Sequence, residues 1–220
     1  SKVAKPDVLG AIYRIERKNN SSPKDPRGLK LDWKKPQVDW LSDKRPAVVK
    51  RAIDALAQVG NVDRLKEAKA RKSALWSLNR IPGKQARSAV RSFLKDENPE
   101  VRLAAIHSVA LWFDAGAVES LIGFLDSGDL RERRLAAMAL GRIEDRRAVK
   151  PLLKAGLAPA DPFLKHAVTY ALYEIGDESL LVDHPMSKHI GLMRKVDEQS
   201  PSKYVMPEIQ LADTAEPDPA

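Results

Sequence analysis

The hydrophobic positions of the chain recur in segments that can be laid over one another without gaps. Four such segments begin at Pro46, Pro99, Leu130 and Pro162, and a weaker fifth copy begins at Ala68. In each of them, apolar or small residues occupy the seventh, tenth, eleventh and fourteenth positions. Spacings of three, one and three residues place these side chains on one face of an α-helix. The pattern therefore predicts one amphipathic helix in each copy.

The residues at these four positions indicate how the helices pack. The seventh and tenth positions hold mainly small residues, which let neighbouring helices approach closely. The eleventh and fourteenth hold larger residues, which we expect to fill the space between layers. In the four main copies they are Ala52, Ala55, Leu56 and Val59; Ala105, Ser108, Val109 and Trp112; Ala136, Ala139, Leu140 and Ile143; and Val168, Ala171, Leu172 and Ile175. Proline suits the first helical position, and Asn98 and Asp161 are expected to act as N-caps.

A second helix is predicted after each first helix. One of its positions holds alanine in three copies, at Ala86, Ala117 and Ala148. The position four residues later holds a larger apolar residue, at Val90, Leu121 and Leu152. The starts at residues 68, 99, 130 and 162 are 31, 31 and 32 residues apart, and the links are so short that the helices must form antiparallel hairpins. Repeated hairpins bury each other's apolar faces and form an α-solenoid. We therefore predict an all-α, right-handed α-solenoid of about five helical hairpins.

The two ends of the chain do not follow the repeat. Residues 6–18 are predicted to form a short β-strand because they are rich in β-branched and aromatic residues, and a polar linker follows over 19–29. The predicted organisation has three parts: residues 1–41, a strand-like lead-in and basic linker that ends a preceding domain; residues 42–182, the repeat solenoid; and residues 183–220, a degenerate repeat followed by an irregular tail rich in proline and acidic residues.

Net charge and composition exclude several classes of protein. The formal net charge is +8, and residues 1–51 account for all of this excess. The basic excess therefore belongs to the lead-in, which disfavours a nucleic-acid-binding domain with a basic face. The chain has no cysteine, which excludes disulfides, thiolate nucleophiles and covalent haem attachment within it. No stretch approaches the roughly 20 consecutive apolar residues that a membrane-spanning helix needs.

Catalytic and metal-binding patterns are also missing from the sequence. It contains no glycine-rich phosphate loop, no Gly-x-Ser-x-Gly motif and no paired carboxylates at a catalytic spacing. The four histidines are His107, His166, His184 and His189. None is followed by glutamate, and they do not share a repeat position, so the three or four convergent ligands of a metal site are not expected. We assign no catalytic, cofactor-binding or metal-binding residue, and interpret His107 and His166 as groove or interface residues.

Basic residues recur at the fourth and fifth positions of the first helices. They are Lys50, Arg71, Lys72, Arg102, Arg133, Arg134, Lys165 and His166. On stacked helices this row would run along one edge of the solenoid, and we treat it as a candidate interaction ridge. The ridge is either a phosphate track for nucleic acid, or a set of arginines paired with acidic turn residues such as Asp96, Asp129 and Asp161. We favour the second interpretation.

Two stretches of the chain resemble a known family of repeats. NPEVRLAAIHSVAL with GAVESLIGFL, and RERRLAAMALGRIEDRRAVKPLL, are similar to the HEAT-like repeats of bilin-lyase-type proteins. The resemblance implies a HEAT-type solenoid. Because such repeats serve many partners, it does not by itself imply a function.

A narrower resemblance covers nearly the whole chain. The phrases LGAIYRIERK, DPRGLKLDW, LSDKRPAVVKRAI, HSVALWFDAGAV and HAVTYALYEIGD are similar to the middle of large planctomycete-type proteins described as membrane-bound dehydrogenases or haem-binding proteins. In that family a β-propeller precedes the HEAT segment, and a c-type cytochrome region with a Cys-x-x-Cys-His motif follows. The resemblance implies a bacterial connector segment in the periplasm or cell envelope. It places any c-type haem elsewhere in a longer parent chain and no cofactor in this segment.

These observations predict a non-catalytic scaffold or protein-interaction module. Its partner would be another protein, or the neighbouring propeller and cytochrome-like domains of a redox-type protein. Two alternatives stay open. One is a nucleic-acid-binding HEAT protein of the DNA glycosylase type, which the charge distribution disfavours. The other is a chromophore lyase-like HEAT protein, which would retain an open-chain tetrapyrrole.

Overall fold

Every regular element in the described part of the chain is a helix. The computed structural model describes residues 24–157, 161–176 and 187, and contains no strand among them. The predicted strand over 6–18 lies outside the described residues, as does the C-terminal region over 183–220 apart from Ser187. The predicted all-α fold is confirmed. The chain divides into two compact units, one ending at Arg80 and the other beginning at Ile81.

In its described residues, 24–80, the first unit contains one 3-10 helix and three α-helices. They are η1 (Val38–Ser42), α1 (Pro46–Val59), α2 (Val62–Lys66) and α3 (Arg71–Arg80). Helix α1 packs against η1 and α3, and α2 packs against α3. The core between them includes Leu41, Val48 and Leu75, each no more than 2% exposed. Because α2 has only 5 residues, the first copy of the repeat is shorter than the others.

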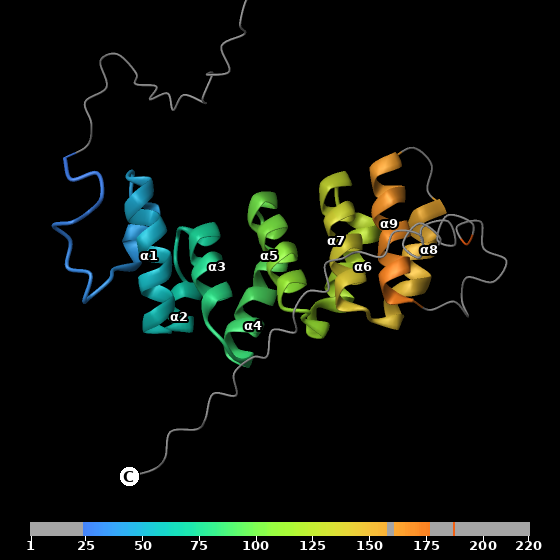
Figure 1. Cartoon of the computed structure of the whole chain (residues 1–220), viewed down its shortest axis with the longest axis horizontal. Helices are drawn as coiled ribbons and strands as arrows, with labels where there is room; N and C mark the ends of the chain where they lie inside the picture. The colour runs from blue at the N-terminus through green and yellow to red at the C-terminus, as the bar shows by residue number, and fades with distance from the viewer. Residues whose placement is uncertain (1–23, 158–160, 177–186, 188–220) are drawn as a thin grey trace, which may run out of the picture. The chain divides into compact units, whose positions relative to one another are not determined.

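The second unit arranges its helices in two layers. Its elements are α4 (Lys84–Ser92), η2 (Phe93–Lys95), α5 (Pro99–Leu111), η3 (Ala115–Ala117), α6 (Val118–Ser127), α7 (Leu130–Ile143), η4 (Arg146–Ala148), α8 (Val149–Leu157) and α9 (Pro162–Ile175). The first helices α5, α7 and α9 lie side by side, with α7 in contact with both neighbours (Figure 1). The second helices α6 and α8 pack against each other and against α7 and α9 respectively.

The predicted helical stripe forms the core of the second unit. The residues at its seventh, tenth and eleventh positions in α5, α7 and α9 are all no more than 1% exposed. The residues at the two predicted positions of the second helices are also no more than 1% exposed. They are Ala86, Ala117 and Ala148, and Val90, Leu121 and Leu152. These predictions are confirmed, and the small side chains at the seventh and tenth positions explain why the first helices lie so close together.

The fourteenth position fills the space between layers only in the weaker copy, where Ile81 is 7% exposed, and not in the four main copies. Val59 is 59% exposed and Trp112 is 45% exposed, while Ile143 and Ile175 are half-buried. For the four main copies the prediction was wrong, because this position is at the end of the first helix, where the chain turns away before a neighbouring helix covers the side chain. Trp112 also stacks against Arg87, whose guanidinium carbon lies 4.0 Å from the ring centroid.

The first helices begin and end with recognisable caps. Asn98 and Asp161 each accept a hydrogen bond from the backbone N–H two residues later, as predicted, and Asp145 does the same before η4. The residue at the fifteenth position takes a left-handed conformation in four repeats. Its φ values are 73° at Gly60, 50° at Phe113, 57° at Glu144 and 70° at Gly176. Glycine adopts this conformation without strain, whereas phenylalanine and glutamate do not.

The contact between α7 and α9 depends on one glycine. A Cβ added to Gly141 would lie 2.6 Å from the Cα and 2.9 Å from the Cβ of Ala171. No side chain larger than hydrogen fits there unless the two helices move apart. Glu174 also lies against Gly141, and its partial burial raises the pKa of its carboxyl group. Gly141 therefore sets the distance between the two helices.

We expect Gly141→Ala to lower the free energy of unfolding of the second unit by about 1–3 kcal/mol, because the added methyl group collides with the α9 backbone. Gly123 on α6 is the matched control, since a Cβ there meets nothing within 4 Å. Gly123→Ala should raise stability by up to about 1 kcal/mol through helix propensity. Urea denaturation followed by circular dichroism measures both. Equal effects of the two substitutions would contradict the close contact.

We expect Glu144→Gly to stabilise the second unit by about 1 kcal/mol, because glycine removes the strain of the left-handed conformation at this exposed position. Glu144→Ala removes the same carboxylate but keeps a Cβ, so it should bring no such gain. Thermal unfolding of the two variants separates the backbone effect from the charge effect. A gain of the same size in the alanine variant would attribute the change to charge.

Candidate functional site

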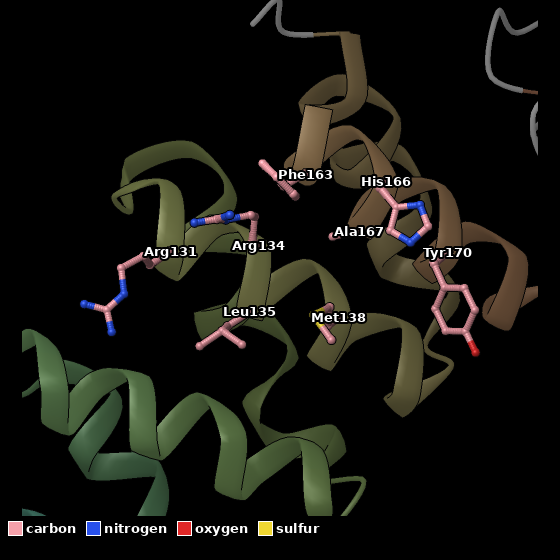
Figure 2. Close-up of a pocket in the computed structure, with 8 residues that line it drawn as sticks. All are labelled: Arg131, Arg134, Leu135, Met138, Phe163, His166, Ala167 and Tyr170. Carbon is pink, nitrogen blue, oxygen red and sulfur yellow. The ribbon is translucent and has the colours of Figure 1, made fainter. Parts of the chain in front are cut away.

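A groove of about 460 Å³ lies between α7 and α9 in the second unit (Figure 2). Its lining residues are Arg131, Arg134, Leu135 and Met138 from α7, and Phe163, His166, Ala167 and Tyr170 from α9. Each helix contributes its second, fifth, sixth and ninth positions. This i, i+3, i+4, i+7 stripe lies beside the buried stripe on the same helices, so the groove follows from the parallel stacking of two equivalent helices.

Large apolar side chains stand exposed along this groove. Phe163 is 67% exposed, Met138 49% and Tyr170 44%. Figure 2 shows the Phe163 side chain near Arg134 at one end, and Met138 between the two helices. Leu135 is half-buried and Ala167 is buried, and they form the floor. Several large apolar groups gathered in one concavity are typical of a binding site, whereas single exposed ones need no explanation.

The groove also carries basic side chains. The Nε of Arg134 donates to the Leu130 carbonyl oxygen at 3.0 Å, and lies 3.8 Å from Oδ2 of Asp161. Its guanidinium carbon lies 5.6 Å from the centroid of the Phe163 ring. His166 is exposed on α9, three residues after Phe163. Of the described residues that line the groove, none carries a carboxylate.

Arg131 belongs to the rim of the groove. It points away from α9 (Figure 2), and its Nη1 lies 3.0 Å from Oε1 of Glu100 on α5. Both residues occupy the second position of their repeats and both are about half exposed. This ion pair is shorter than the 3.8 Å pair between Arg134 and Asp161, so Arg131 is the less available of the two arginines to a ligand, although exposed pairs of this kind are weak.

Arg102 forms a buried ion pair outside the groove. Its Nε lies 2.6 Å from Oε1 of Glu132, and its Nη1 donates to the carbonyl oxygens of Asp96 and Glu97. The Glu132 side chain is only 5% exposed, and its other oxygen accepts a hydrogen bond from the backbone N–H of Asp129. The pair therefore joins α5 to the start of α7.

Comparison with known families is consistent with this repeated architecture. Residues 62–134 match the family described as HEAT repeats, and residues 132–155 match the family described as PBS lyase HEAT-like repeat. The chain carries HEAT-like repeats. No curated protein matches the sequence at a significant level. With the helical hairpins described above, these matches establish an all-α HEAT-type solenoid, and they leave the narrower resemblance to planctomycete-type redox proteins without support.

Two kinds of feature are absent from the described residues. No group of three or more histidine, cysteine, aspartate or glutamate residues there is arranged to hold a metal ion. Among the same residues, no helix has both the length and the apolar character to cross a membrane.

The ridge predicted from the fourth and fifth positions of the HEAT-like repeats is divided among different environments. Arg134 and His166 reach the groove, whereas Arg102 is held in its ion pair. Arg133 is half-buried, and its buried Nε has no hydrogen-bond partner among the described residues, while Lys165 is exposed. The remaining three belong to the first unit, where Lys50 and Lys72 are exposed and Arg71 is half-buried.

Several site residues were missed by sequence reasoning. Phe163, Met138 and Tyr170 had no assigned role, although their positions in the repeat follow a helical stripe. The ridge arginines were expected to pair with acidic turn residues such as Asp96, Asp129 and Asp161. Arg134 does pair with Asp161, whereas Arg102 contacts the Asp96 carbonyl and takes its carboxylate partner from Glu132 in α7. The signal for Glu132 was the Asp-x-x-Glu spacing of a capping box, which Asp129 and Glu132 form.

We expect Glu132→Ala to lower the free energy of unfolding by about 3 kcal/mol, because it removes the buried carboxylate that pairs with half-buried Arg102 and one half of a capping box. Glu119→Ala is the matched control. It breaks the Arg147–Glu119 ion pair, whose side chains are 54% and 75% exposed, and should cost less than about 1 kcal/mol. Urea denaturation measures both. A cost for Glu132→Ala no greater than that of the control would show that the buried pair contributes little.

Proposed function

We propose that the chain is a non-catalytic protein-interaction module that binds a partner through the groove between α7 and α9. One observation carries this proposal: Phe163, Met138 and Tyr170 expose large apolar surfaces within a single concavity. HEAT-type solenoids commonly present extended surfaces to partner proteins. Burying these three side chains would contribute roughly 25 cal/mol for each Å² of apolar surface removed from water.

The dimensions of the groove suit a short segment of protein. Its lining runs from the second to the ninth position of each helix, a distance of about 10 Å at 1.5 Å per residue. That length accommodates two neighbouring side chains of a peptide, which lie about 5–7 Å apart on one face of a helix or strand. The walls are held in place because α7 and α9 are in contact at Gly141 and Ala171.

The nucleic-acid alternative receives less support from the basic residues. A phosphate track needs a continuous row of available cations. Arg102 is engaged by Glu132, and Arg131 faces Glu100. Only Arg134 and His166 of the predicted ridge line the groove.

Two finer proposals rest on sequence resemblance. One is that these repeats join a propeller to a cytochrome-like domain in a larger redox-type protein. Propeller blades encoded upstream and a Cys-x-x-Cys-His motif downstream in the same reading frame would support it, and a frame without them would contradict it. The other is a chromophore lyase-like role, which the match of residues 132–155 to PBS lyase HEAT-like repeats keeps open. A protein that stays colourless when an open-chain tetrapyrrole is co-produced would contradict that role.

A selection from phage-displayed random 12-residue peptides tests the interaction module directly. We expect selected peptides to bind the full chain. The double variant Met138→Glu/Tyr170→Glu should bind them at least tenfold more weakly, because a bound peptide would have to bury the two introduced carboxylates. Leu157→Glu is the control, since Leu157 on α8 is 58% exposed and does not line the groove. Isothermal titration calorimetry gives the affinities. Peptides that bind the groove variant as tightly as the unaltered protein would contradict the assignment of the site.

A further inference from the structure

Helix α7 brings an unbalanced set of charges to the groove. It contains four arginines and one acidic residue, Glu132. Glu132 is buried and paired with Arg102, so it does not offset the charges on the exposed side of the helix. Helix α9 adds Lys165 and His166, both exposed. Asp161 and Glu100 pair with Arg134 and Arg131 beside the groove, but the described lining residues include basic side chains and no carboxylate. The lining therefore carries a local basic excess, although residues 52–220 of the chain carry no net charge.

Arg134 has unused hydrogen-bonding capacity at the groove. Within the described part of the chain, its Nε makes the only hydrogen bond of this guanidinium, to the Leu130 carbonyl oxygen. The carboxylate of Asp161 is 3.8 Å away, beyond hydrogen-bond distance. Among the described residues, no hydrogen bond engages its terminal nitrogens, so they can donate to an additional acceptor while Nε stays paired with Asp161. A guanidinium presents its donors in a planar fork that matches a carboxylate.

The charged and apolar parts of the groove are next to each other. The Arg134 guanidinium lies against the exposed Phe163 ring, and His166 lies between Phe163 and Tyr170 along α9 (Figure 2). A ligand that buries an apolar side chain against Met138 and Phe163 must bring its neighbouring groups close to Arg134 and His166. Acidic groups at those places would be attracted, and basic groups would be repelled.

We infer that the groove between α7 and α9 recognises an acidic segment of a partner protein, in which a bulky apolar side chain is flanked by aspartate or glutamate. This inference rests on the proposed function and adds the chemistry of the partner. The apolar side chain occupies the concavity, and the carboxylates face Arg134 and His166. A nucleic acid would also be attracted by the arginines of the lining, but most of the lining residues are apolar, which suits an aliphatic or aromatic side chain better than a phosphate backbone.

The composition of peptides selected from the random 12-residue library tests this inference. We expect sequences that combine a tryptophan, phenylalanine or leucine with neighbouring acidic residues. For one selected peptide, a matched version with asparagine and glutamine in place of aspartate and glutamate should bind about tenfold more weakly, since it loses charge-assisted hydrogen bonds. The double variant Arg134→Gln/His166→Gln should bind the acidic peptide about tenfold more weakly and the neutral version unchanged.

Controls separate charge at the groove from general charge and from folding. Lys150→Gln removes an exposed cation on α8 that does not line the groove, and it should leave both peptides' affinities unchanged. Thermal unfolding checks the folding of every variant. Arg134 lies near the cap of α9, so Arg134→Gln could lower stability. In that case the single variant His166→Gln supplies the test, and its affinity for the acidic peptide should be several-fold lower.

The possible failures have different consequences. Groove-dependent peptides without acidic residues, or equal affinity for the acidic and neutral versions, would overturn the inference and leave the interaction module in place. No groove-dependent peptide at all would contradict the proposed function as well. A fluorescein-labelled 20-nucleotide single strand that binds more tightly than the selected peptide, and loses binding in Arg134→Gln/His166→Gln, would assign the groove to nucleic acid and overturn the inference.

Discussion

The close approach of neighbouring first helices is the constraint on which the second unit depends. Small residues at the seventh and tenth positions allow it, and between α7 and α9 Gly141 meets Ala171 with no room for a Cβ. At this distance the larger residues at the eleventh position can bury completely, as Leu140 and Leu172 do. Each hairpin then covers the apolar face of the next, which is why stability in such arrays arises mainly from the interfaces between neighbours.

The same stacking creates the features that bear on function. Because α7 and α9 are equivalent helices in contact, the same four positions of each line one shared groove. The contact between α5 and α7 instead brings Glu100 to Arg131 and Arg102 to Glu132. One repeated geometry thus produces a charged interface in one place and an uncovered apolar groove in the next. The difference depends on which side chains the individual repeats carry.

The repeat pattern predicted most of the fold because helical periodicity is a local property of the sequence. The small and apolar stripe, the proline starts and the caps at Asn98 and Asp161 all appear where they were expected. The fourteenth position failed for a tertiary reason. Val59 and Trp112 continue the helical stripe in sequence, but at a helix end no neighbouring element covers them. Periodicity indicates which way a side chain points, and it does not indicate what lies opposite.

The sequence by itself determined that the chain is helical, repeated and built through small residues, because these properties follow from spacings within single helices. Only the tertiary structure decided what the basic residues do. Arg102 and Arg134 occupy neighbouring columns of the repeat and looked alike in sequence, yet Arg102 turns to Glu132 while Arg134 lines the groove. Thirty residues separate Arg102 from Glu132, and only the stacking of α5 on α7 brings them together. The exposed surface of Phe163 and Met138 likewise depends on which residues a neighbouring helix leaves uncovered.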